Sequence, residues 1–217
     1  MSVWGSAKLC PKRARFAIGG YSQLARFSPI HSFRLMNIVA SLETPRLSLR
    51  ELILSDWQAV HKYASNPEVV KYLPFGPNTI KDTKKFLYRN LGHQQTQPRE
   101  HFILAVTLKD YGELIGSGRI SITNVENKEG SIGYSLNQDF WGHGYATEVA
   151  AALINFGFKQ LQLHRIYATC DPENLSSARI LEKIGMKQEG YLREHYLIRA
   201  EWRDSLLYAI LDHEWKI

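Results

Sequence analysis

A glycine-containing segment in the second half of the chain has the residue types of an anion-binding loop. It reads Phe140-Trp141-Gly142-His143-Gly144-Tyr145-Ala146-Thr147-Glu148 and lies between a strand-like and a helix-like run. The first N–H groups of a helix have no intrahelical partner, and the helix dipole places partial positive charge there. Glycines let the backbone approach a ligand closely, so a phosphate or pyrophosphate is a natural occupant. A tight turn that serves only packing is the alternative.

The same segment lacks the marks of two common nucleotide-binding motifs. No Lys followed by Ser or Thr comes after the glycines, as a nucleoside-triphosphate P-loop requires. The third glycine of the dinucleotide fingerprint is missing, and the preceding strands form a meander rather than a βαβ unit. Neither class of ligand is therefore expected.

A second segment raises the case for a ligand site. Asp171-Pro172-Glu173-Asn174 ends a strand-like run, and a helix-like run from Ser176 to Ile184 follows it. With this segment the chain resembles the Gcn5-related N-acetyltransferase (GNAT) superfamily, and within it the ribosomal-protein N-terminal acetyltransferases of the RimJ/RimL type. Over roughly residues 43 to 215, the passages that carry the resemblance are G-Y-S-L…F-W-G-H-G-Y-A-T-E, H-R-I-Y-A-T-C-D-P-E-N-x-S-S-x-R-I-L-E-K-I-G-M and E-G-Y-L…E-W-R-D-S-L-L-Y-A-I.

The resemblance implies acetyl-coenzyme A as co-substrate, with its pyrophosphate on the main-chain N–H groups of the loop. It implies these cofactor-binding residues: Leu136, Trp141, Gly142, His143, Gly144, Tyr145, Ala146, Thr147 and Asn174. The superfamily usually has Gln or Arg where Trp141 stands, so side-chain help is absent there. The strand ending at Leu136 is expected to splay from its neighbour and bond the pantetheine like an added strand. Asn174 is expected to reach the pantetheine or acetyl region, a turn or cap being its alternative role.

Attack of an amine on a thioester needs a proton acceptor for the ammonium and hydrogen-bond donors for the oxyanion and the leaving thiolate. Many superfamily members use a Tyr as the catalytic acid, and Leu181 stands at that position here. Ser177 matches the position at which RimL-type enzymes carry a Ser proposed for the same role, so the resemblance makes Ser177 the candidate acid. A helix N-terminal Ser bonded to its own backbone is the alternative. Glu194 is the candidate base, because RimJ-type sequences are acidic at that position. The RimL-type base falls on Tyr196, one strand repeat away and expected on the same face; an exposed ion pair is the alternative role of Glu194.

No metal is expected. The eight histidines include no H-E-x-x-H, and the chain has no cysteine cluster. Glu148 is expected to complement the dipole of its helix rather than to act in catalysis.

The residues around these motifs predict a mixed α/β (α+β) fold in a single domain. Apolar periodicity and turn residues predict strands over residues 46–50, 101–109, 113–125, 131–136, 164–170, 186–198 and 202–211, and helices over 55–64, 66–68 onward, 79–95, 146–160 and 176–184. A helical crossover after an antiparallel meander requires at least one parallel strand pair. The GNAT resemblance implies a central, mostly antiparallel and splayed sheet flanked by helices.

The basic charge of the chain is concentrated at its start. The formal net charge is +6, yet residues 1–42 contain six Lys or Arg and no Asp or Glu, so the remaining 21 basic residues balance the 21 acidic ones. We therefore expect no nucleic acid to bind through the folded part. Residues 1–42 are expected to be a basic, disordered extension and residues 43–217 the N-acetyltransferase domain. A targeting segment, or a start assigned too early with Met36 as the true one, is the alternative for the extension.

Of the two cysteines, Cys10 lies in the extension and Cys170 in the body; one body cysteine cannot make an internal disulfide framework, so a reducing compartment, the cytoplasm, is expected. No run approaches the ~20 apolar residues of a membrane span, and no membrane partner is expected.

The resemblance favours transfer of an acetyl group to the α-amine of a protein N-terminus, such as that of a ribosomal protein, by direct attack in a ternary complex. The protein would be a monomer or homodimer. A small amine (a polyamine, an aminoglycoside or an aminoacyl toxin) is the alternative acceptor. A catalytically silent acyl-coenzyme A sensor or scaffold is the alternative of another class.

Overall fold

The computed structural model describes residues 41–216 of the 217-residue chain. The strands of this part form one eight-stranded sheet in the order β1-β2-β3-β4-β5-β6-β8-β7. They are β1 (Leu42–Glu43), β2 (Leu47–Glu51), β3 (His101–Leu108), β4 (Leu114–Asn124), β5 (Glu129–Leu136), β6 (Arg165–Cys170), β7 (Lys187–Ile198) and β8 (Glu201–Leu211). The β5–β6 pair is parallel and the other neighbours are antiparallel. The predicted mixed α/β fold with one parallel pair is confirmed.

The helices begin and end where local signals predict. They are α1 (Trp57–Ala64), α2 (Pro67–Val70), α3 (Ile80–Gln95), α4 (Tyr145–Lys159) and α5 (Leu175–Lys183), with 3₁₀ turns η1 (Leu54–Asp56), η2 (Gln138–Phe140) and η3 (Asp212–Glu214). Thr79 and Asp82 form a reciprocal capping box at the start of α3. Gly185 follows α5 with a φ of 86°, the left-handed conformation that commonly ends a helix.

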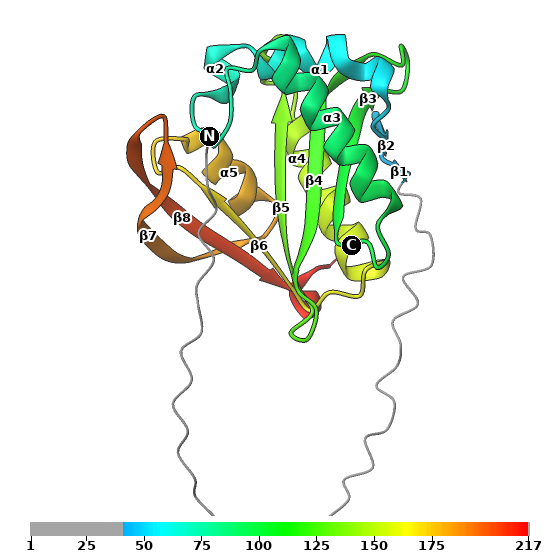
Figure 1. The fold of residues 1–217 in the computed structure, drawn as a ribbon. Helices are drawn as coiled ribbons and strands as arrows, with labels where there is room; N and C mark the ends of the chain where they lie inside the picture. The colour runs from blue at the N-terminus through cyan, green and yellow to red at the C-terminus, as the bar shows by residue number, and fades with distance from the viewer. Residues whose placement is uncertain (1–40, 217) are drawn as a thin grey trace, which may run out of the picture. The chain divides into compact units, whose positions relative to one another are not determined.

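Helices cover both faces of the sheet (Figure 1). The helix α4 lies on one face, where Val149, Leu153 and Phe156 are fully or almost fully buried in the main core. The helices α1 and α3 lie on the other face over a smaller core that includes Val60 and Leu87. This arrangement leaves the part of the sheet beyond α3 available for a site.

The sheet splits in its middle. The strands β5 and β6 pair only between Glu129 to Ser131 and Arg165 to Tyr167, whereas β5 stays paired with β4 as far as Leu136. Figure 1 shows the two strands meeting at one end and diverging toward the other. The second half of β5 therefore has main-chain groups on its β6 side with no strand partner among the described residues. The splayed sheet implied by the resemblance is present.

The predicted basic extension lies outside the described residues except for its last two positions. Leu42, which the prediction assigned to the extension, belongs to β1 and pairs with Leu49 of β2. No helix among residues 41–216 has the length and apolar character needed to cross a bilayer.

Candidate active site

The glycine loop has the geometry of an anion-binding helix start. Gly142 and Gly144 have φ angles of 79° and 78°, in the left-handed region that favours glycine, and α4 begins directly after Gly144. No residue between 41 and 216 accepts a hydrogen bond from the main-chain N–H groups of Gly142 to Thr147. The Trp141 indole donates to the carbonyl oxygen of Leu136 at 3.0 Å, which ties the loop to the end of β5. The loop therefore presents consecutive free donors at a helix N-terminus.

A brace from the start of the domain holds this loop. Arg46 donates to the Glu148 carboxylate through its Nε (2.8 Å) and Nη2 (2.7 Å), and through its Nη1 to the carbonyl oxygen of His143 (2.9 Å). Its guanidinium also lies over the Tyr145 ring, 4.6 Å from the centroid. Burial alone would raise the pKa of Glu148, but hydrogen bonds from Thr44 and Arg46 hold that pKa below its ordinary value. Glu148 therefore forms an ion pair with Arg46 and also lies in the first turn of α4.

Two hydroxyl groups meet beside the open edge of β5. The Tyr134 hydroxyl, from β5, lies 3.1 Å from Oγ of Ser177, in the first turns of α5. Burial raises the pKa of Tyr134 to about 12, a shift that the hydrogen bond with Ser177 opposes. Burial likewise raises the pKa of the nearby Cys170 thiol to about 11. Near neutral pH this corner of the molecule therefore offers un-ionised hydrogen-bond donors.

Asn174 caps α5. Its Oδ1 accepts from the Ser177 main-chain N–H at 3.1 Å, which is the cap role that the sequence left open. The Nδ2 group has no acceptor among the described residues. Asn174 thus has donors free to bond a ligand beside the Ser177 hydroxyl.

Glu194 lies in a bulge of β7, with a φ of 51°. Its main-chain N–H donates to Oδ1 of Asp204 at 2.7 Å, and the register shifts between Leu192 and Tyr196. A bulge interrupts the alternation of side chains along a strand. The regular alternation behind the prediction that Glu194 and Tyr196 share a face is interrupted here; Tyr196 lines the cavity described next, and Glu194 is not among the described lining residues.

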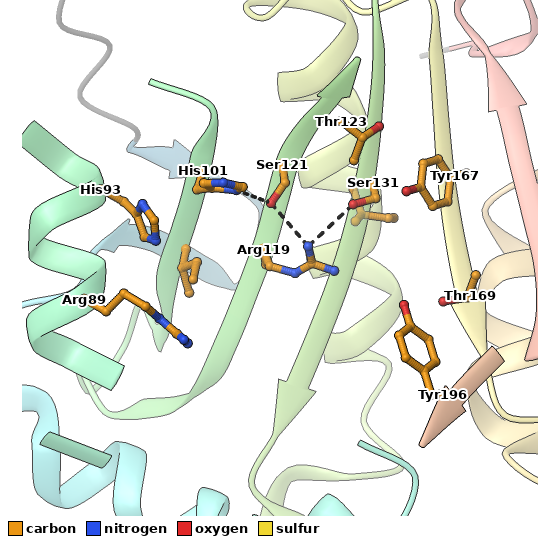
Figure 2. Close-up of a pocket in the computed structure, with 12 residues that line it drawn as sticks. Arg89, His93, His101, Arg119, Ser121, Thr123, Ser131, Tyr167, Thr169 and Tyr196 are labelled. Atoms are coloured by element: carbon orange, nitrogen blue, oxygen red, sulfur yellow. Dashed lines mark hydrogen bonds between the residues drawn. The ribbon is translucent and has the colours of Figure 1, made fainter. Parts of the chain in front are cut away.

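A cavity of roughly 400 Å³ opens on the face of the sheet beside α3 (Figure 2). Basic residues lining it come from α3 (Arg89 and His93), β3 (His101) and β4 (Arg119), and Tyr196 of β7 lines the opposite side. No Asp or Glu is among the described residues that line it. Burial, then the neighbouring His101 and arginines, lower the pKa of His93. The described lining of the cavity therefore carries the positive charge of two arginines and no carboxylate.

Comparison with known proteins identifies the class. The acetyltransferase (GNAT) domain family matches residues 46–187, and the chain belongs to that family. It is an acetyl-coenzyme A-dependent acetyltransferase, as predicted. The uncharacterized N-acetyltransferase YnaD of Bacillus subtilis (strain 168) is 39% identical over 174 residues, which cover 80% of this chain and 98% of YnaD. A GNAT-family acetyltransferase from Bacillus anthracis has a similar structure, with 38% identity, a TM-score of 0.73 and coverage of 81% and 100%.

Other relatives carry more specific names. The ribosomal-protein-S5-alanine acetyltransferase of Vibrio fischeri is 26% identical with a TM-score of 0.70, covering 82% of this chain and 100% of its own. Mycobacterium smegmatis RimJ in complex with CoA-disulfide is 25% identical with a TM-score of 0.73, covering 82% and 90%. The spermidine N(1)-acetyltransferase of Escherichia coli (strain K12) is 25% identical over 169 residues, covering 78% and 88%. The likeness to RimJ-type enzymes is thus confirmed, while the named acceptors of the relatives differ.

The sequence did not identify Arg46, Tyr134 or Arg119 as candidate site residues. Arg46 pairs with a carboxylate 102 positions away, and the Tyr134 hydroxyl meets a residue 43 positions away. Neither pairing leaves a local signal. Arg119 did leave one, because Arg119, Ser121 and Thr123 place polar side chains at alternate positions of an otherwise apolar central strand.

Proposed function

We propose that this protein transfers the acetyl group of acetyl-coenzyme A to the α-amine of a protein N-terminus, such as that of a ribosomal protein, in the cytoplasm. The amine attacks the thioester directly in a ternary complex, forming a C–N bond as the C–S bond breaks. The observation that carries the proposal is the row of unengaged N–H groups from Gly142 to Thr147, which follows the open end of β5 and the turn η2.

The loop and the open strand fit coenzyme A in two ways. The N–H groups of residues 142–147 would hold its pyrophosphate, and the Arg46 brace keeps their orientation fixed before binding. The main-chain groups that β5 turns toward β6 after Ser131, apart from the Leu136 carbonyl, would pair with the amide groups of the pantetheine arm, as an added strand does. Both sets of contacts would be made by the main chain. They need no Gln or Arg side chain at position 141, so a Trp can stand there.

The hydroxyls of Tyr134 and Ser177 would stabilise the leaving thiolate. A Tyr with a pKa of about 12 is a weaker acid than a thiol, whose ordinary pKa is about 8.5, so proton transfer to sulfur would be uphill. A hydrogen bond to the developing thiolate needs no such transfer and favours the bond-breaking step. We therefore assign the pair a hydrogen-bonding role and not that of a proton donor.

The proton of the incoming ammonium needs a different acceptor. Glu194 remains a predicted base, acting through water from the β7 bulge. Tyr196, which does line the cavity, is its rival on the same strand. Comparing the pH dependence of kcat/KM in Glu194→Gln and Tyr196→Phe separates them, because only loss of the true base removes the acidic limb of the profile.

The charge of the cavity favours a peptide over a polyamine as acceptor. A polyamine carries several positive charges and would meet two arginines with no lining carboxylate. The named activity of the Vibrio fischeri relative points in the same direction, whereas the Escherichia coli spermidine acetyltransferase is the specific case for the small-amine alternative.

Two measurements test the proposed function. Calorimetry with acetyl-coenzyme A should give saturable heat, and thiol release should then depend on a peptide with a free N-terminus. The same peptide with a blocked N-terminus and an intact Lys should be inert. Turnover confined to polyamines or aminoglycosides would overturn the protein acceptor, and binding without turnover of any amine would indicate a silent sensor. No heat would overturn the cofactor assignment.

A further inference from the structure

One arginine fastens the tip of the β7–β8 hairpin to the end of α2. Arg199 donates through Nη2 to the carbonyl oxygen of Val70 (2.8 Å) and through Nη1 to that of Lys71 (3.1 Å). Its Nη2 also lies 3.4 Å from the carbonyl oxygen of Phe75. The last carbonyl groups of a helix lack intrahelical donors and carry partial negative charge, so a guanidinium binds well there. Arg199 therefore joins two segments that are far apart in the sequence.

The turn that carries Arg199 is made of residues that its backbone disfavours. Arg199 and Ala200 connect the paired residues Ile198 and Glu201, and both have positive φ angles, 51° and 68°. Two-residue turns of this kind favour Asn-Gly and similar pairs, because a Cβ atom disfavours the left-handed region. A local preference that is broken in this way is expected where a residue serves the wider structure. The contacts of Arg199 with α2 are that wider role.

The helix α2 is itself attached to the arm of the sheet that ends in β5. Asn66, its N-cap, donates through Nδ2 to Oε1 of Gln138 at 3.1 Å. Lys62 of the preceding helix α1 pairs with Asp139 at 2.9 Å. Both partners lie in η2, the turn between β5 and the glycine loop. Figure 1 shows α2 between the end of β5 and the tip of the hairpin. Through Arg199, α2 therefore connects the two arms of the split sheet at its open end.

The hairpin in turn holds the segment that carries Asn174 and Ser177. Arg203 of β8 donates through Nε to Asp171 (2.9 Å) and through Nη2 to Glu173 (2.9 Å). These carboxylates lie between β6 and α5, directly before Asn174, and the Asp171 side chain is buried. Asn174 then accepts from the Ser177 main-chain N–H. The position of the hairpin therefore influences where Asn174 and Ser177 lie relative to β5.

We infer that Arg199 is a positioning residue for acetyl transfer, because it fastens the hairpin to α2 and so sets the width of the split between β5 and the β6–α5 turn. The inference rests on the proposed binding of coenzyme A along β5. The pantetheine arm would lie on β5, and Asn174 and Ser177 would approach it from the other arm, so the two arms must keep a fixed separation. The contact of Tyr134 with Ser177 is a second link across this split.

Replacement of Arg199 by Gly separates the link from the turn. Arg199→Gly removes the guanidinium, while glycine suits the left-handed position and favours the turn itself. With acetyl-coenzyme A and a peptide with a free N-terminus, kcat/KM for the peptide should fall roughly 10- to 100-fold, because small misplacements of reacting groups are costly. The dissociation constant of acetyl-coenzyme A should change by no more than about threefold, since the glycine loop is untouched. Arg199→Lys should retain part of the activity, because an ammonium keeps the charge without the fork that spans two carbonyl groups.

The control variant is Ala200→Gly, at the neighbouring left-handed position. It relieves the same kind of backbone conformation and keeps the link, so kcat/KM should equal that of the wild type. Unchanged kcat/KM in Arg199→Gly, or an equal loss in Ala200→Gly, would overturn the inference. Thermal unfolding shows whether each variant is folded at the assay temperature, and a loss of activity that matches the unfolded fraction would overturn it as well.

Hydrogen–deuterium exchange tests the link without turnover. Coenzyme A should slow the exchange of residues 142–147 in both the wild type and Arg199→Gly, but should slow that of residues 174–177 much more in the wild type. This pattern without acetylation of any amine tested would reject the proposed function and support the role of Arg199. Equal protection of residues 174–177 in the two proteins would reject that role. No protection of residues 142–147 in the wild type would reject both.

Discussion

Replacement of Tyr134 by Phe tests the proposed chemistry most directly. The change removes the hydroxyl that lies 3.1 Å from Ser177 Oγ and keeps the ring that packs against the main core. The structural cost should therefore be that of one hydrogen bond, about 0.5–1.5 kcal/mol of unfolding free energy, with no cavity created.

The expected catalytic effect is larger than the structural one. Removing one preorganised donor from a developing negative charge costs about 2.7–4 kcal/mol, or roughly 10²- to 10³-fold in kcat. The dissociation constant of acetyl-coenzyme A should change by no more than about threefold, because the main chain of the loop makes the expected contacts with the pyrophosphate. Loss of kcat with retained affinity is the signature of a donor that acts in the transition state.

Ser177→Ala and the double variant complete the experiment. Because the two hydroxyls form one hydrogen-bonded pair, their effects on kcat should not multiply, and the double variant should resemble the more damaged single one. Thiol release at saturating acetyl-coenzyme A gives kcat, and calorimetry gives the affinity. An unchanged kcat in Tyr134→Phe, or a loss explained entirely by weaker acetyl-coenzyme A binding, would refute the assigned role.

Three further predictions concern the loop, its brace and the buried thiol. Gly142→Ala should weaken acetyl-coenzyme A binding several-fold and cost about 1 kcal/mol of stability, whereas Gly112→Ala, at another left-handed position with open space around its Cβ, should cost the same stability and leave binding unchanged. Glu148→Gln should lower the stability by about 1–2 kcal/mol at pH 7. Because the folded state lowers the pKa of Glu148, wild-type stability should fall as the pH drops below about 4.5, so urea unfolding should show the two proteins converging at low pH. Burial raises the pKa of Cys170 from 9.0 to about 11, which lowers the fraction of reactive thiolate at pH 8. Cys170 should therefore be alkylated roughly 100-fold more slowly in the folded protein than in the urea-unfolded chain, as peptide mapping by mass spectrometry would show. Similar rates would contradict its burial.

The sequence alone predicted every helix and every strand from β2 onward, but not β1, and it pointed to the glycine loop before α4. The boundaries of the expected strands and helices agree with the structure within two residues, because caps, turn glycines and apolar periodicity act over a few neighbouring positions. The loop around Gly142 and Gly144 was recognisable for the same reason: strand, glycines and helix start are contiguous. The family followed from three motifs with their order and spacing.

The tertiary structure alone decided which side chains face each other. The bulge at Glu194 interrupts the regular alternation on which the sequence-based expectation rested, and the Glu194 main-chain N–H donates to Asp204 across the hairpin. The contact of Tyr134 with Ser177 joins residues 43 positions apart, and the residues that line the cavity around Arg119 come from α3, β3, β4, β5, β6 and β7. Strand register and splay are set by the packing of the whole sheet against its helices, so no short stretch of sequence contains them. Local interactions therefore determined the elements and the glycine loop, and long-range packing decided which side chains lie near that loop and around the cavity.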